Sequence, residues 1–117
     1  MRNATQNLAK TISLQELADE LGGKVWQKGD LLRIYFDTDR TAKAYLDFDF
    51  DSPARQGKAE IDEAGYIVGA GLYVFSNCEK QGSRWNLNRK KQIKFELMQK
   101  ISAFTGCEIC DSWEEVL

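Results

Sequence analysis

The strongest constraint on the fold is the strict alternation of apolar and polar side chains from Ala42 to Phe50. Every second residue is apolar, Leu46 among them, and the residues between include Lys43 and Asp47. Successive side chains of a β-strand point to opposite faces, so the pattern predicts a strand with one buried and one wet face. Such strands are typical of antiparallel sheets, and another layer must cover the buried face.

A helix is predicted before the strands, because its start and its end are both marked. Ser13 and Glu16 form an S-x-x-E capping box, which satisfies backbone donors at a helix start. Apolar residues then follow at helical spacing through Leu17 to Leu21. Gly22, at the start of a glycine pair, ends the helix, since glycine reaches the left-handed conformation at little cost.

A second, longer helix is predicted from about Asn86 to Phe104. Ile93, Leu97 and Ile101 recur at helical spacing and form one apolar stripe. The sequence Thr105-Gly106 then stops the helix.

Four further strands are predicted between turn signals. They are Lys24–Lys28, Leu31–Phe36, Lys58–Asp62 and Tyr66–Ser76. The dipeptide Gly29-Asp30 predicts a two-residue hairpin turn between the first two of them. Gly69 and Gly71 interrupt the last one, which predicts a bulge or a close approach of another backbone segment.

These elements predict an α+β fold in the order helix, five strands, helix. Short connections favour antiparallel neighbours, and two helices with one apolar stripe each can cover one sheet face. We therefore expect an antiparallel sheet of about five strands with two helices packed on one face. A short strand or ordered tail is expected over Cys107 to Leu117. The outer sheet face is expected to carry Arg33, Lys43, Tyr45, Asp47 and Asp49.

The length of 117 residues corresponds to one domain. Residues 1–11 show no periodicity and are expected to form a flexible N-terminal arm, followed by a single α+β domain over residues 12–117. No run approaches the roughly 18 apolar residues that a membrane span needs, and the N-terminus lacks the apolar core of a signal peptide. We therefore expect a cytoplasmic protein without membrane contact.

The absence of histidine removes whole classes of chemistry from this chain. A serine or cysteine nucleophile is usually activated by an imidazole base, and zinc sites often rely on imidazole ligands. No glycine-rich phosphate loop is present either, because Gly65, Gly69 and Gly71 have neither the spacing nor a following helix. The sequence predicts no catalytic residue, no cofactor and no metal.

The cysteines carry one weaker alternative. Cys107 and Cys110 form a C-x-x-C pair, and Cys78 supplies a third thiol. A redox pair normally opens a helix, whereas this pair follows a predicted helix end. Three thiols also fall short of the four ligands of structural zinc. We expect reduced, buried side chains, with a zinc-stabilised adaptor as the alternative.

The acidic strand carries a second alternative. Asp47, Asp49 and Asp51 alternate along one face, where carboxylates can hold Mg²⁺ or Mn²⁺ with a further ligand such as Glu60 or Asp62. This arrangement is the basis of an alternative function, a metal-dependent phosphodiesterase or nuclease. Outward carboxylates also occur on any solvated strand and discourage edge pairing, which is the simpler interpretation.

The charge distribution points to binding. The net charge is only −2, yet residues 80–100 contain seven basic residues and one acidic residue. Cations at a helix start oppose the helix dipole, so helix stability does not explain them, and Trp85 offers a ring that can stack on a base. The candidate binding residues are Arg84, Trp85, Arg89, Lys90, Lys91 and Lys94.

The sequence therefore predicts a small, non-catalytic, cytoplasmic binding module. The basic N-terminal part of its second helix is expected to contact an anionic partner, either an acidic protein surface or a nucleic-acid backbone. The oligomeric state and the identity of the partner are left open by the sequence.

Overall fold

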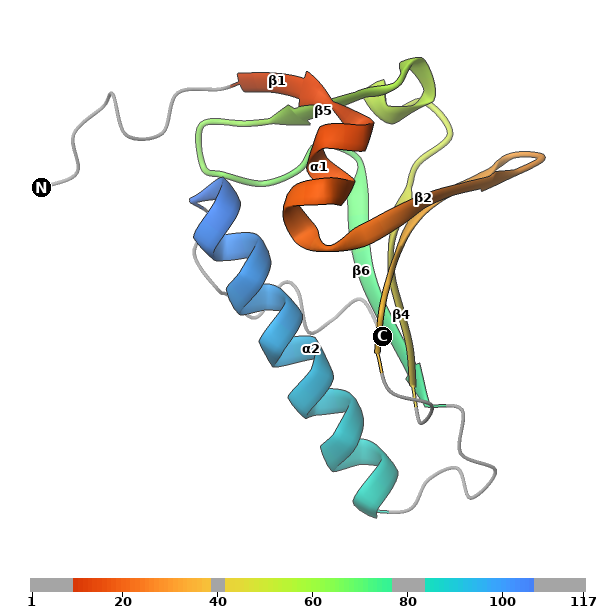
Figure 1. The fold of residues 1–117 in the computed structure, drawn as a ribbon, viewed down its shortest axis with the longest axis vertical. Coiled ribbons are helices and arrows are strands. Elements are labelled where there is room, and N and C mark those ends of the chain that lie inside the picture. Colours follow the sequence, from red (N-terminus) through yellow and green to blue (C-terminus); the bar gives the residue numbers. More distant parts are fainter. Residues whose placement is uncertain (1–9, 39–41, 77–83, 107–117) are drawn as a thin grey trace, which may run out of the picture.

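The computed structural model describes residues 10–38, 42–76 and 84–106, with the backbone alone for residues 76 and 84–87 (Figure 1). Within these ranges the chain forms two helices and six strands. In chain order the elements are β1 (Lys10–Ser13), α1 (Leu14–Leu21), β2 (Gly23–Lys28), β3 (Leu31–Phe36), β4 (Ala42–Phe48), the 3₁₀ turn η2 (Pro53–Gln56), β5 (Lys58–Ile61), β6 (Ala70–Ser76) and α2 (Arg84–Thr105).

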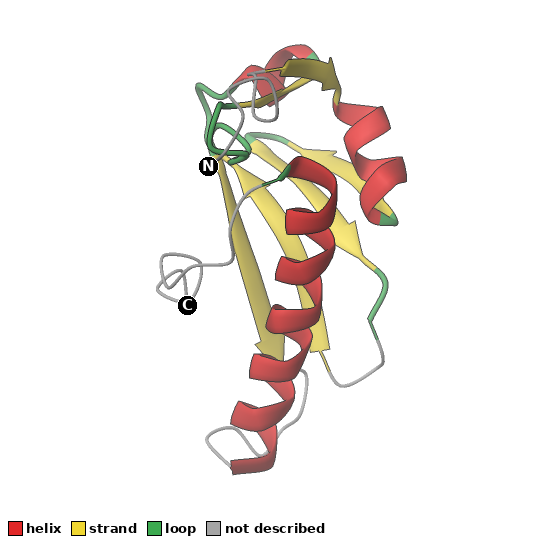
Figure 2. Cartoon of the chain, turned by 90° about the vertical axis from the view of Figure 1, so that its left-hand side faces the viewer, coloured by secondary structure: helices red, strands yellow, loops and turns green. Residues whose placement is uncertain are grey.

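The predicted α+β class is confirmed, but the strands divide between two antiparallel sheets. Four strands pair in the order β2-β3-β4-β6, and β1 pairs with β5 in a separate ribbon. Figure 2 shows α2 lying across one face of the four-stranded sheet, with α1 beside it. The expectation of one sheet with about five strands is thus corrected. Lys10 and Thr11, expected in the N-terminal arm, belong to β1.

The start and end of α1 follow the predicted capping signals. The Ser13 hydroxyl accepts a hydrogen bond from the Glu16 amide at 2.9 Å. Gly22 has a φ of 72°, the left-handed conformation that closes a helix. Leu17 and Leu21 are fully buried, so the apolar stripe of α1 faces the core as predicted.

The predicted hairpin joins β2 and β3. Lys28 lies opposite Leu31, and Gly29 in the turn has a φ of 58°. No other type of residue in the described ranges has a positive φ, so Gly29 alone supplies the left-handed turn position. Antiparallel pairing continues from β3 to β4 and from β4 to β6, which places the predicted alternating strand in the interior of the sheet.

The core lies between the inner face of this sheet and the helices. Alternate residues of β3, β4 and β6 are buried there; they are Leu32, Ile34, Phe36, Ala44, Leu46, Phe48, Leu72 and Val74. The stripe of α2 meets them through Ile93, Leu97 and Ile101, as predicted. Phe50 was expected on the same buried face, but β4 ends at Phe48 and the Phe50 side chain is 69% exposed.

The β1–β5 ribbon is joined to the rest of the molecule by backbone contacts. The Leu14 amide donates to the Gly57 carbonyl at 2.9 Å, which connects the start of α1 with the start of β5.

Gly69 confirms the predicted close approach, since a Cβ at this residue would lie 2.5 Å from the Ser52 Cβ. Its φ of 75° also favours glycine. The strand predicted from Tyr66 therefore begins only at Ala70.

Over the described ranges, no helix combines the length and the apolar character that a membrane crossing requires. The longest helix, α2, has 22 residues and carries charged side chains along its length.

Candidate functional site

The outer face of the four-stranded sheet, which faces away from α2, carries a row of aromatic rings. Trp26 comes from β2, Tyr35 from β3, Tyr45 from β4, and Tyr73 and Phe75 from β6. Tyr45 lies directly opposite both Tyr35 and Tyr73 in the strand register. These five residues, called the aromatic strip below, therefore cross all four strands.

The rings of the aromatic strip contact one another in sequence. The centroids of Trp26 and Tyr35 are 5.6 Å apart, with the ring planes at 89°. Tyr35 and Tyr45 are 5.1 Å apart, and Tyr45 and Tyr73 are 5.7 Å apart. The rings of Tyr73 and Phe75 are 6.4 Å apart and parallel within 1°. All these separations are in the range of favourable aromatic pairs, so the rings support one another in place.

The central ring of the aromatic strip, Tyr45, is buried, and the four rings around it are accessible to solvent. Tyr45 is only 8% exposed, and this burial raises the pKa of its hydroxyl above the ordinary value. Phe75 is 44% exposed, and Trp26, Tyr35 and Tyr73 are partly exposed. The accessible rings around Tyr45 can therefore meet a ligand without rearrangement of the sheet.

Gly71 lies on the same face and allows the Tyr73 ring to lie close to the backbone. A Cβ at Gly71 would come within 3.2 Å of that ring. Gly71 lies opposite Asp47 in the β4–β6 pair, and because glycine has no side chain, no side chain projects from the sheet at this position of β6. A side chain here would make a tight contact with the Tyr73 ring and require it to shift slightly, so glycine suits this position of the strip.

Arg33 occupies the centre of the outer face. Its Nε donates to the Asp47 carboxylate at 2.9 Å, and its Nη1 donates to the Tyr35 hydroxyl at 3.0 Å. Its guanidinium also lies 4.2 Å from the centroid of the Tyr45 ring. Partial burial lowers the pKa of Arg33, but the hydrogen bonds that Arg33 donates to Tyr35 and Asp47 outweigh it and leave the pKa above its ordinary value. Arg33 is thus a fixed, permanently charged part of the face.

Exposed lysines surround the aromatic strip. Lys24 lies opposite Tyr35, Lys28 is the last residue of β2, and Lys43 lies opposite Phe75. The outward strand positions therefore carry these three lysines and Arg33 against the single carboxylate of Asp47. Since the chain as a whole has a net charge of −2, this excess of positive charge is a local property of the face.

The basic start of α2 is a separate surface, and its predicted members are divided. Lys91 is exposed, and Arg89 and Lys90 are partly exposed, whereas Lys94 is only 4% exposed. The side chains of Arg84 and Trp85, in the first turn of α2, are outside the described residues.

Carboxylates accompany part of this basic charge. Arg89 lines a cavity of about 320 Å³ between the end of β3 and α2. Asp37, Glu96 and Lys100 line the same cavity, so two cations and two carboxylates share its lining. The outer sheet face therefore concentrates positive charge more clearly than this part of α2 does.

The acidic strand is not arranged as a metal site in the described ranges. Asp47 pairs with Arg33, and Asp49 and Asp51 are exposed beyond the end of β4. No three carboxylate or thiol residues among the described positions are grouped closely enough to hold a metal ion. The three cysteines of the alternative zinc site, Cys78, Cys107 and Cys110, lie outside the described residues, as does the short strand or tail expected over Cys107 to Leu117.

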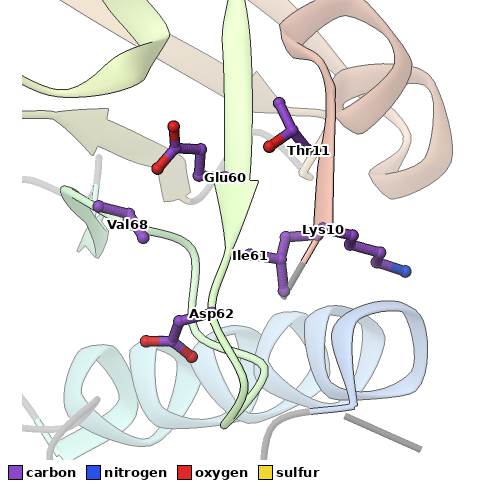
Figure 3. A pocket seen from close by; sticks show the side chains of 6 residues that line it. All are labelled: Lys10, Thr11, Glu60, Ile61, Asp62 and Val68. Carbon is purple, nitrogen blue, oxygen red and sulfur yellow. The ribbon is translucent and has the colours of Figure 1, made fainter. Parts of the chain in front are cut away.

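A second hollow, of about 280 Å³, lies beside the β1–β5 ribbon (Figure 3). Its lining includes Lys10, Glu60 and Asp62, but the ammonium group of Lys10 points away from both carboxylates. That group lies 5.0 Å from the centroid of the Phe104 ring. Asp62 accepts hydrogen bonds from the amides of Ala64 and Tyr66 at 3.0 Å, which gives this carboxylate a structural role in the turn.

No protein-family model, curated protein or solved structure matches this chain.

Sequence reasoning placed only part of this site. Arg33, Lys43, Tyr45 and Asp47 lie on the outer face as expected, while Asp49 lies just beyond the end of β4. The other four rings of the strip were not identified as site residues. The signal was present, because Tyr35, Tyr73 and Phe75 each alternate with buried aliphatic residues of their own strands.

Proposed function

We propose that this chain is a small, non-catalytic binding module whose contact surface is the outer face of the four-stranded sheet. The observation that carries the proposal is the aromatic strip, which crosses all four strands and lies on the face that α2 does not cover. Exposed groups of apolar side chains on a soluble domain mark interaction sites, and tyrosine, tryptophan and arginine dominate contact energies. All three residue types are present on this face.

The charge of the face indicates an anionic partner. Lys24, Lys28 and Lys43 are exposed, and the one carboxylate at an outward strand position, Asp47, is paired with Arg33. A cationic surface on an acidic molecule accelerates the encounter with an anion and orients it. The exposed part of the basic start of α2, around Lys91, is a second candidate contact surface for an anionic partner.

The alternative of a metal-dependent phosphodiesterase is weaker. Its first proposed ligand, Asp47, already forms an ion pair with Arg33, so a metal ion would have to displace the guanidinium. No observation on the described residues favours this function over binding.

Retention on immobilised heparin tests the proposed function, because heparin is a general polyanion. Two variants each remove two lysine charges, Lys24→Gln with Lys43→Gln on the sheet face and Lys90→Gln with Lys91→Gln on α2. We expect the sheet-face variant to elute at a clearly lower salt concentration and the α2 variant to elute close to the unmodified chain. Thermal melting of each variant verifies that the fold is intact.

The opposite ranking of the two variants would move the contact surface to α2. An unmodified chain that does not bind heparin at low salt would contradict the anionic partner.

A further inference from the structure

We propose that the anionic partner is a single-stranded nucleic acid, whose bases stack on the aromatic strip while its phosphates contact the surrounding lysines. This inference rests on the proposed function of the same face and names its ligand. It commits to single-stranded DNA or RNA, which share both the base rings and the charged backbone.

The rings are arranged as a stacking platform for successive bases. Trp26 and Tyr35 lie on β2 and β3, and Tyr73 and Phe75 lie on β6, with partly exposed surface on each. Neighbouring centroids are 5.1 to 6.4 Å apart, so a strand that crosses the sheet meets an accessible or supporting ring at every β-strand. Because every base has a π face, stacking of this kind tolerates many base sequences.

The charges surround the rings rather than interrupting them. Lys24 and Lys28 extend from β2 at one edge of the sheet, and Lys43 lies beside Phe75 toward the other edge. Phosphates attached to stacked bases lie outside the bases, where flexible lysines can reach them. Arg33 and Asp47 neutralise each other at the centre, so no unpaired carboxylate from the strands faces a base there.

The same features disfavour the two other anionic partners. In a duplex the bases are already stacked, and the major groove admits a helix or a two-stranded ribbon rather than the face of a four-stranded sheet. An acidic protein surface would pair with the lysines, but its carboxylates would meet the electron-rich faces of the rings. Only unpaired bases use the rings and the cations together.

Fluorescence anisotropy with labelled oligonucleotides tests the inference on the full chain. The probes are a thymidine homo-oligomer and a uridine homo-oligomer of about 12 nucleotides, within the site sizes of small single-strand binders, and a duplex of the same length. We expect both single strands to bind at least about tenfold more tightly than the duplex at low salt. Their affinity should fall steeply between about 50 and 200 mM salt.

Two substitutions on the face have matched controls elsewhere. Phe75→Thr removes an exposed ring from the strip, and we expect it to weaken single-strand binding about tenfold. Phe95→Thr removes a ring of similar exposure, 52%, from α2 and should leave the affinity unchanged. Lys43→Gln should lower the salt slope by about one, whereas Lys58→Gln on β5 should not. Thermal melting monitors the fold of all four variants.

Each outcome separates the inference from the proposed function. Equal affinity for single strands and duplex, or no effect of Phe75→Thr, would overturn base stacking. Retention on heparin without oligonucleotide binding would overturn the inference and leave the proposed function standing. No binding to either would contradict both. A dimer in sedimentation experiments that Phe75→Thr converts to a monomer would assign the strip to self-association and also overturn the inference.

Discussion

The inner and outer faces of the four-stranded sheet are made by alternate residues of the same strands, yet they have different composition and surroundings. Inward residues such as Ile34, Leu46 and Leu72 are aliphatic and fully buried against the helix layer. Outward residues such as Tyr35 and Tyr73 are aromatic, partly exposed and accompanied by cations. The comparison separates two roles, since burial on one face stabilises the fold and accessibility on the other leaves rings available to a ligand.

The largest expected effect comes from breaking the inner face. Leu46→Ala should lower the free energy of unfolding by about 2 to 5 kcal/mol, because it removes buried methyl groups and leaves a cavity. Urea denaturation measures the change. At a temperature where the variant is folded, its affinity for the thymidine homo-oligomer should equal that of the unmodified chain. A loss below about 1 kcal/mol would mean that the inner face is not the main source of stability.

A smaller effect is expected from the ion pair on the outer face. Arg33→Gln, Asp47→Asn and the double variant form a double-mutant cycle, and their coupling energy should lie between about 0.2 and 1 kcal/mol. The pair is partly exposed, which keeps its contribution small although the Nε–carboxylate distance is 2.9 Å. Additive effects of the two substitutions would show that the neighbouring Tyr35 and Tyr45 side chains, rather than Asp47, hold Arg33 in place.

Two exposed rings lie on different layers of the molecule, Phe75 on the outer sheet face and Phe95 on α2. Phe75→Thr on the outer face and Phe95→Thr on α2 should each lower the free energy of unfolding by no more than about 1 kcal/mol, because both side chains contact solvent, although Phe75 also loses its ring contacts with Tyr45 and Tyr73. Chemical denaturation of the two variants measures this change. A loss of several kcal/mol for Phe75→Thr would show that the aromatic strip is a second core rather than a contact surface.

The smallest effect is a change in alkaline stability. Burial raises the pKa of the Tyr45 hydroxyl, so the folded state favours the protonated phenol. Its contribution to stability is complete below the unfolded pKa of about 10 and is lost as the pH rises through the higher folded pKa. Tyr45→Phe lacks this group, and its melting temperature should fall less steeply above about pH 10. Identical slopes for both proteins would contradict the role of Tyr45 burial.

The parts of the fold that local patterns predict are those with local causes. The alternation around Leu46 predicted β4, the Ser13 hydroxyl and Gly22 marked α1, and Gly29 marked the hairpin, each confirmed by the structure. The division into two sheets depends instead on the pairing of β1 with β5, two four-residue strands far apart in the chain. Periodicity within a strand carries no information about its distant partner.

The candidate site was harder to predict for the same physical reason. The sequence placed Tyr45 on an outer face, but a strip forms only because the strand register brings Tyr35 and Tyr73 opposite it. The lysines and arginines near the start of α2 lie close together in the sequence, so the sequence alone shows their concentration. The cations of the sheet face are dispersed along the chain and gather only after strand pairing.

The β1–β5 ribbon has a consequence for how the molecule assembles. Its pairs join residues such as Lys10 and Ile61, whereas β2, β3 and β4 follow one another along the chain. Closing a long loop lowers the entropy of the chain before stabilising contacts form, so we expect β2, β3 and β4, which are joined by short connections, to pair faster. We therefore expect the ribbon to close late in folding and to exchange its amide hydrogens sooner than the interior strands.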